Sequence, residues 1–238
     1  MPIKNFIKRL FPSKKPAHSA IVANNLISVA SDKDLPVRDC EFVVFDTELT
    51  GLNQRKDEMI AIGAVRIKNM RICCDDTFYA LIKPRGKLHS PSTLIHRITP
   101  GELQGAEPIN DVLPRFIDFC SGAFLVGHHV SLDLSFVNRA CENYLGGTIQ
   151  SSSLDTMRLA MAYKASMSGP YFDHHEKRNS YRLSFLSEEF HLPKFEEHNA
   201  LQDAFQTAYL FIYLIHKMRP GNTGTVNDYL KIGGTRKT

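Results

Sequence analysis

The stretch EFVVFDTELTG, residues 41–51, places two acidic residues directly after a short apolar run. The residues FVVF near its start predict a buried β-strand. Asp46 and Glu48 follow this run and stand two positions apart. Because successive side chains of a strand point to opposite faces, these two carboxylates are expected to project side by side. Two like charges at that distance repel, so one pKa should rise unless a positive group lies between them.

The composition of the chain is that of an ordinary globular protein. Its 238 residues are 43% hydrophobic and 23% charged. No apolar run approaches the roughly 18 residues that a membrane span needs, and Pro2 and the basic residues after it interrupt any signal-peptide core. The five cysteines form no CxxC pair, which argues against a disulfide framework or a structural zinc site. A cytoplasmic protein in a reducing compartment is predicted, with no membrane partner.

Basic residues gather near both ends of the chain, whose formal net charge is +4. The first 31 residues contain five basic residues and no acidic one, and three more basic residues follow residue 230. Basic ends around a more neutral body suit a polyanionic partner. A solvated tail that keeps the protein soluble explains them equally well.

Changes in periodicity and composition along the sequence predict three regions. Residues 1–38 lack sustained periodicity and are interpreted as a basic extension and linker. Residues 39–219 are interpreted as one domain, and residues 220–238 as a frayed tail. Within the domain, three strand-like runs are followed by alternating helices and strands, which predicts an α/β fold with a mixed sheet. Asp46 and Glu48 then stand at a strand end, where open α/β sheets usually bind ligands.

The elements expected in this domain can be read from its apolar runs and turn signals. The expected strands are FVVFD, MIAIGAVRI, TFYALI and AFLVGH. The expected helices are TPGELQ, PINDVLPRFIDFC, residues 131–145, a helix after SSSLDT that ends near residue 163, and residues 182–191 and 200–218. Residues 165–180 are interpreted as a polar loop.

Two further acids stand where helices are expected to begin. Asp133 falls in the first turn of a helix whose expected N-cap is Ser131, and Asp203 follows Asn199 and Gln202, which resemble a capping box. The helix macrodipole alone explains either aspartate, because it favours an acid at a helix N-terminus. Together with the first pair, however, they make an all-oxygen site suited to Mg²⁺ or Mn²⁺. Two such ions about 3.5–4 Å apart can bind the attacking and leaving oxygens of a phosphoryl displacement.

The segments FDTELTG, GHHVSLD and HNALQDA resemble the three exonuclease motifs of the DnaQ-like family, in its DEDD class with histidine in the third motif. Their order and spacing match the family over residues 41–214. The resemblance implies a ribonuclease H-like fold, with a mixed five-stranded sheet flanked by helices. It also implies a 3′→5′ exonuclease that releases nucleoside monophosphates. Proofreading subunits of bacterial replicative polymerases belong to this family, so a polymerase or sliding clamp is an implied partner. The apolar residues of IKRLFPS offer a docking segment for it, but a disordered basic tail near nucleic acid is the favoured interpretation of this stretch.

The resemblance also implies a role for each matching residue. Asp46, Glu48, Asp133 and Asp203 would hold two Mg²⁺ or Mn²⁺ ions, and His198 would be the general base. This division agrees with the chemistry, because hard cations prefer oxygen ligands and an imidazole accepts a proton near neutral pH. The substrate contacts that the resemblance implies come from Thr50, Gly51, Leu52, His96 and His128.

Four positions depart from the family pattern. Leu49 replaces a small polar residue that is common after the first acidic pair, and this change should be tolerated. Arg97 stands where glycine is more frequent, His129 where asparagine is usual, and Leu132 where an aromatic residue is usual. None of them removes a carboxylate, although His129 is placed to alter metal affinity or strand contact. Asp155 matches a frequent family position and is expected to start a helix.

Three functions are compatible with the motifs. The first is an exonuclease acting on DNA 3′ ends, with proofreading in trans beside a polymerase as one setting for it. The second is an exonuclease acting on RNA or short oligonucleotides, since contacts to a 2′-hydroxyl cannot be located in the sequence. The third is a non-catalytic module that binds nucleic acid, which the complete set of five catalytic residues argues against.

Overall fold

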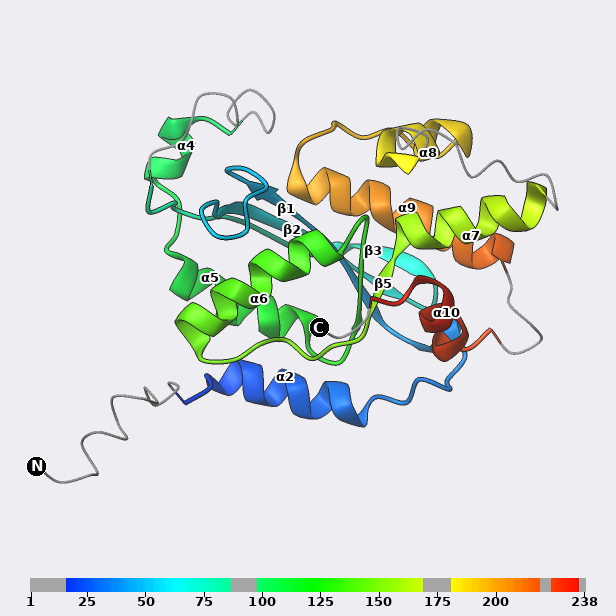
Figure 1. The fold of residues 1–238 in the computed structure, drawn as a ribbon, viewed down its shortest axis with the longest axis horizontal. Helices are drawn as coiled ribbons and strands as arrows, with labels where there is room; N and C mark the ends of the chain where they lie inside the picture. The colour runs from blue at the N-terminus through cyan, green and yellow to red at the C-terminus, as the bar shows by residue number, and fades with distance from the viewer. Residues whose placement is uncertain (1–15, 87–97, 169–180, 219–223, 236–238) are drawn as a thin grey trace, which may run out of the picture.

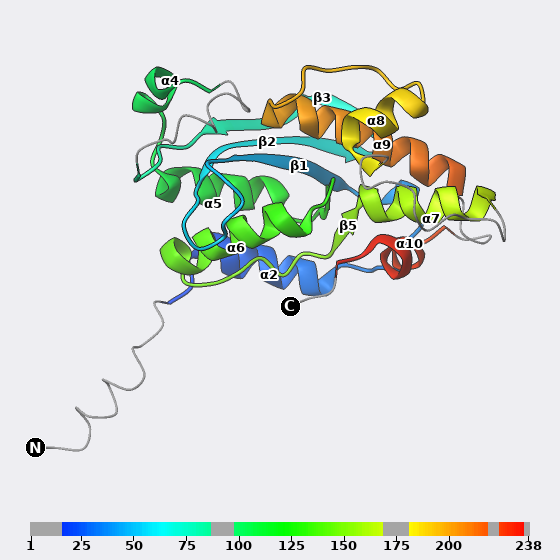
Figure 2. The ribbon, with the colours of Figure 1, turned by 45° about the horizontal axis from the view of Figure 1, so that its top comes forward.

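The computed structural model describes residues 16–86, 98–168, 181–218 and 224–235. A five-stranded sheet lies between two layers of helices, as expected (Figure 1 and Figure 2). Its strand order is β3-β2-β1-β4-β5; the first three strands are antiparallel, and β4 and β5 run parallel to β1. The strands are β1 (Phe42–Leu49), β2 (Met59–Lys68), β3 (Arg71–Leu81), β4 (Phe124–Gly127) and β5 (Ser153–Asp155).

Strand β1 lies at the centre of the sheet, and its side chains alternate between two hydrophobic clusters. Val43 and Phe45 pack on the side of helices α5 (Ile109–Cys120) and α6 (Ser131–Leu145). Phe42 and Val44 pack on the opposite side, against helix α9 (Ala200–Met218). Figure 2 shows these helices on opposite faces of the sheet. The same alternation directs both carboxylates that follow in β1 to one face, as their spacing predicted, and this is the face covered by α9.

A glycine in β2 determines how closely α9 approaches the sheet. Gly63 is the register partner of Asp46 in the neighbouring strand. A Cβ atom at position 63 would lie 2.1 Å from the backbone nitrogen of Leu201, which belongs to the first turn of α9. The missing side chain therefore allows the first turn of α9, which carries Asp203, to lie directly on β2 beside β1.

We expect Gly63→Ala to lower the free energy of unfolding by about 3 kcal/mol, towards the upper end of the usual cost of overpacking. The added methyl group meets backbone atoms of α9, which cannot move aside as a flexible side chain would. Chemical denaturation measures the difference. Gly105→Ala is the matched control, because a Cβ there meets nothing within 4 Å; equal stability of the two variants would contradict the prediction.

The segments interpreted as linker and tail both contain helices, so those interpretations were wrong. Helix α2 (Ser19–Ala30) packs against α5, and helix α10 (Val226–Gly233) packs against α7 (Thr156–Ser168) and β5. The backbone nitrogen of Asn227 donates to the carbonyl of Lys33, which joins the two segments to each other. The predicted domain boundaries themselves remain predictions, and IKRLFPS lies outside the described residues.

Other elements differ from the expectation at their ends. Helix α7 continues to Ser168, into the stretch interpreted as a loop, and strand β3 already begins at Arg71. The N-cap of α6 is Val130 rather than Ser131, which is the first helical residue. The remaining elements are the short helices η1 (Val37–Asp39), α4 (Pro100–Gln104) and α8 (Leu183–Glu189). No helix in the described parts of the chain is long and apolar enough to cross a membrane.

Candidate active site

Three carboxylates from β1 and α9 meet at the end of β1. Asp46, Glu48 and Asp203 each offer an oxygen atom, and these atoms all lie within 4.8 Å of one another. The convergence has two causes: the alternation of β1 directs both of its acids to one face, and the close approach at Gly63 brings the first turn of α9 to the same place. Two acids from one strand and a third acid that is distant in the sequence therefore form one cluster.

Asp133 reaches the same region from the other face of β1. It lies in the first turn of α6 and is 5% exposed. Its Oδ1 accepts hydrogen bonds from the backbone nitrogen of Thr47 at 3.1 Å and from the Thr47 hydroxyl at 2.5 Å. Thr47 stands between Asp46 and Glu48, so α6 is joined to β1 in the middle of the acidic pair. Thr47 was not singled out from the sequence, although alternation in the expected strand places it on the face opposite to the two acids.

Burial raises the pKa of every carboxylate in this cluster, and repulsion from the other cluster carboxylates adds to it at Asp46 and Glu48. Burial raises the pKa of Glu48 to about 7, with the charges of Asp203 and Asp133 adding to it. Burial also raises the pKa of Asp46 well above its ordinary value, and Asp133, Asp203 and Glu48 raise it further. The charges acting on these two residues are thus all carboxylates, and the repulsion expected from the sequence is present.

The pKa values of Asp133 and Asp203 are also raised, but neighbouring groups partly stabilise their charged forms. Burial raises the pKa of Asp133 to about 7, against the effect of its hydrogen bonds from Thr47. Burial raises the pKa of Asp203 to about 6, against a hydrogen bond from the backbone of His198 and the nearby imidazole. Acidic side chains that are buried together in this way suit a hard divalent cation, because such a cation prefers oxygen ligands and would relieve the repulsion between the carboxylates. Asp46, Glu48 and Asp203 are therefore able to hold a divalent cation, and Asp133 as a fourth ligand remains a prediction.

We expect the metal-free protein to lose stability as the pH rises from about 4 to about 7. The folded state binds protons on these carboxylates more tightly than the unfolded chain, whose carboxyl pKa values lie near 4. Deprotonation therefore favours unfolding, and the effect is complete above the raised pKa values. In EDTA, the midpoint of thermal unfolding should fall by about 5 °C or more across this window, and Mn²⁺ should restore it. If the unfolding midpoint of the variant Asp46→Asn fell equally steeply with pH, the carboxylate cluster would not be the origin of the effect.

His198 lies on the solvent-facing side of Asp203. Its backbone nitrogen donates to Asp203 Oδ2 at 2.9 Å, and its φ of 64° places it in the left-handed region. The side chain is exposed, and its charge lowers the pKa of Asp203. The cap of α9 is formed as expected by Asn199, whose Oδ1 accepts from the nitrogen of Gln202 at 3.2 Å. Only half of the expected capping box is present, because Gln202 Oε1 accepts from the nitrogen of Glu196 instead.

Four of the five residues implied as substrate contacts lie in the described part of the chain. Thr50, Gly51 and Leu52 begin the loop that follows β1, and the side chain of Leu52 is 74% exposed. His96, like Arg97, lies outside the described residues. The contacts of these residues with substrate remain predictions.

His128 is held on both sides by the protein. Its Nδ1 lies 2.9 Å from the Thr156 hydroxyl, and its Nε2 lies 2.9 Å from the carbonyl oxygen of Tyr181. Burial lowers its pKa, which favours the neutral imidazole. The structure thus gives His128 a bracing position between α7 and residue 181, and a direct contact with substrate remains a prediction.

The departure at His129 has a backbone explanation. His129 has a φ of 63°, in the left-handed region where asparagine and histidine are both enriched among residues with a side chain. Its backbone nitrogen donates to Asp155 Oδ1 at 3.0 Å, and the same oxygen accepts from the nitrogen of Met157 at 3.0 Å. The expected helix-start role of Asp155 is confirmed.

Comparison with known proteins identifies relatives in sequence. A family model described as an exonuclease, RNase T, matches residues 43–211. A "DNA polymerase III PolC-type" from Caldanaerobacter subterraneus subsp. tengcongensis is 36% identical over 188 residues, which cover 79% of this chain and 12% of the relative. A protein with the same description from Thermotoga maritima is 33% identical over 197 residues, covering 83% of this chain and 13% of the relative. The chain spans about one eighth of the length of these curated relatives.

Solved structures share the fold at lower identity. Exonuclease X in complex with 5′ overhanging duplex DNA has a TM-score of 0.56 and 21% identity, covering 79% of this chain and 99% of that chain. Escherichia coli Exonuclease I in complex with a dT13 oligonucleotide has a TM-score of 0.65 and 17% identity, covering 76% of this chain and 42% of that chain. These similarities establish a fold shared with nucleases.

Proposed function

The chain belongs to the RNase T exonuclease family, and from this premise we propose that it is a metal-dependent 3′→5′ exonuclease acting on DNA ends. It would hydrolyse the terminal phosphodiester bond and release nucleoside monophosphates. The observation that carries the proposal is the convergence of Asp46, Glu48 and Asp203 within 4.8 Å. The buried Asp133 lies close enough for its charge to raise the pKa of Asp46 and of Glu48. A charge cluster of this kind destabilises the empty protein, which is a reason to expect a cationic ligand.

The proposal assigns the four carboxylates to two Mg²⁺ or Mn²⁺ ions. When bound, the ions would acidify the attacking water and neutralise charge on the attacking and leaving oxygens. The chain's own contribution is to hold the four carboxylates in fixed positions. The pleat of β1 orients Asp46 and Glu48, hydrogen bonds from Thr47 hold Asp133, and a hydrogen bond from the backbone of His198 holds Asp203.

His198 is proposed to accept the proton of the attacking water at an imidazole nitrogen. Its backbone is fixed to Asp203 while its side chain is exposed, so the ring can face a water at the edge of the cluster and pass the proton to solvent. Thr50, Gly51 and Leu52, with His96 and His128, are proposed to contact the terminal nucleotides.

The nature of the relatives supports DNA as the substrate and a replication context. The curated relatives reported above are named DNA polymerase III PolC-type, and the two structural neighbours reported above were solved with DNA. We therefore include in the proposal a proofreading role beside a polymerase or sliding clamp, in the cytoplasm. Association of the chain with a purified polymerase on a mispaired primer tests this part separately from the nuclease activity.

The nuclease proposal is tested with a 5′-labelled single-stranded DNA oligonucleotide in Mg²⁺, Mn²⁺ or EDTA. The expected result is a metal-dependent ladder that shortens from the 3′ end, with nucleoside monophosphates as products. An RNA oligonucleotide of the same sequence runs in parallel, and faster shortening of RNA would overturn the choice of DNA. Binding of either strand without any shortening would overturn the enzyme and favour a non-catalytic module.

A further inference from the structure

The segment that leads to His198 runs between two residues in the left-handed region. His191 has a φ of 54°, and His198 has a φ of 64°. This conformation costs free energy in a residue with a side chain, and it persists only where the surrounding contacts fix it. The contacts of residues 192–197 therefore bear directly on whether His198 keeps its place beside Asp203.

Two glutamines of helix α9 hold this segment through their amide oxygens. Gln206 Oε1 accepts from the backbone nitrogen of Phe195 at 3.2 Å. Gln202 Oε1 accepts from the backbone nitrogen of Glu196 at 2.8 Å. The two glutamines stand four residues apart and therefore share one face of the helix. They bond two successive peptide groups, so the backbone is held at adjacent points just before His198.

The ring of Phe195 anchors the same segment to α9. It is stacked on the ring of Phe205, with 5.9 Å between the ring centroids and 13° between the ring planes. Its centroid also lies 5.7 Å from that of Tyr209, one turn further along α9. Aromatic pairs of this kind stabilise a contact beyond the area that they bury. The rings thus fix where Phe195 lies, and the bond to Gln206 fixes how its peptide group is oriented.

The amide of Gln206 is not explained by the stability of the core. Gln206 is 6% exposed, and its Nε2 has no hydrogen-bond partner in the described part of the chain. A buried amide nitrogen without a partner is unfavourable, and an apolar side chain of similar volume would avoid this cost. The bond from the Phe195 nitrogen is what the amide adds at this position.

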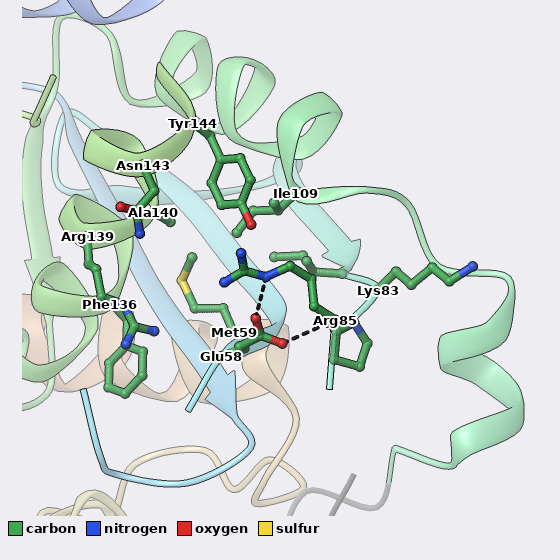
Figure 3. Close-up of a pocket in the computed structure, with 12 residues that line it drawn as sticks. Glu58, Met59, Lys83, Arg85, Ile109, Phe136, Arg139, Ala140, Asn143 and Tyr144 are labelled. Carbon is green, nitrogen blue, oxygen red and sulfur yellow. Dashed lines mark hydrogen bonds and ion pairs between the residues drawn. The ribbon is translucent and has the colours of Figure 1, made fainter. Parts of the chain in front are cut away.

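A neutral acceptor suits a segment that borders the carboxylate cluster. On the α6 side of the sheet, a charged pair is used instead, in which Arg85 bonds Glu58 at 2.8 Å (Figure 3). A further carboxylate in the place of either glutamine would add to the repulsion among Asp46, Glu48 and Asp203. The amide oxygens hold the backbone without changing the charge of the site.

We propose that Gln202 and Gln206 are positioning residues that hold His198 beside Asp203 for the proton transfer. The inference rests on the proposed function, in which His198 accepts the proton of the attacking water. A base that is held in place before the reaction needs no reorganisation when the water loses its proton. Both glutamines bond the backbone rather than the imidazole, so their effect on the reaction passes through residues 195–198.

Turnover of a single-stranded DNA oligonucleotide at saturating Mn²⁺ tests this role. In Gln206→Met and in Gln202→Met we expect kcat to fall about tenfold, because small displacements at an active site have effects of this size or larger. KM should change by less than about twofold, since binding of the substrate is not altered. If the glutamines act through His198, adding Gln206→Met to His198→Gln should change kcat by less than about twofold. Gln150→Met is the matched control, because Gln150 donates to the Thr148 hydroxyl at 3.0 Å and not to this segment.

Amide hydrogen exchange provides a readout that does not require activity. Gln206→Met should speed exchange of the Phe195 amide, and Gln202→Met should speed that of the Glu196 amide. Both variants should also speed exchange of the His198 amide while leaving that of β1 unchanged. Gln202→Glu keeps an acceptor oxygen and should therefore retain slow exchange at Glu196.

The two measurements distinguish this inference from the proposed function. An active enzyme whose kcat is unchanged in both methionine variants would overturn the inference. So would a loss that persists in the His198→Gln background, because the glutamines would then act through another group. Unchanged exchange at His198 would overturn it as well. A wild-type protein that shortens no DNA overturns the proposed function instead, and exchange at His198 still shows whether the glutamines hold it.

Discussion

Asp203→Asn is expected to lower the turnover number by about a thousandfold or more, equivalent to about 4 kcal/mol of lost transition-state stabilisation. Asparagine keeps the shape of the side chain and one oxygen that can accept from the nitrogen of His198. It removes one of the three charges that converge within 4.8 Å, and with it a ligand for a divalent cation. Turnover on a labelled DNA oligonucleotide at saturating Mn²⁺ measures the loss.

The same substitution should keep or raise thermal stability in EDTA. The pKa of Asp203 is raised to about 6, so its charge is unfavourable in the folded protein at neutral pH. Asp111→Asn is the matched control: Asp111 also lies in the first turn of a helix but in α5, outside the cluster. If Asp203 served only the helix macrodipole, both variants would lose a little stability and neither would lose activity. Retained activity in Asp203→Asn would contradict the metal site.

The parts of the site that could be predicted from the sequence depend on local patterns. The alternation of a strand was sufficient to place Asp46 and Glu48 side by side, and a first-turn position was sufficient to place Asp133 near a strand end. The Thr47–Asp133 bond joins residues that are 86 positions apart, so its geometry depends on the packing of α6 against the sheet. A lone glycine within a strand run was the available signal for the close approach at Gly63.

The helices that were missed draw their stability from long-range contacts. Helix α2 buries Ala20, Ile21 and Asn24 but exposes 69% of Leu26 and 78% of Val29. Apolar residues on both sides of the helix leave no clear amphipathic period in the sequence, so tertiary contact with α5 decides the structure. Helix α10 is only eight residues long, too short for periodicity to identify it without its neighbours α7 and β5.

His198→Gln is expected to lower the turnover number by about 10²–10⁴-fold, the usual contribution of a general base. Glutamine can still hydrogen-bond a water but cannot accept its proton at neutral pH. With the carboxylates saturated by Mn²⁺, the rise of the wild-type rate with pH reports deprotonation of the base, and this rise should flatten in the variant. His191→Gln is a close control, because His191 is also an exposed histidine in the left-handed region, with a φ of 54°. Any backbone cost of glutamine there is therefore shared, while only His198 stands beside Asp203. An unchanged pH–rate profile in His198→Gln would remove His198 from the role of base and leave the proton of the attacking water to solvent.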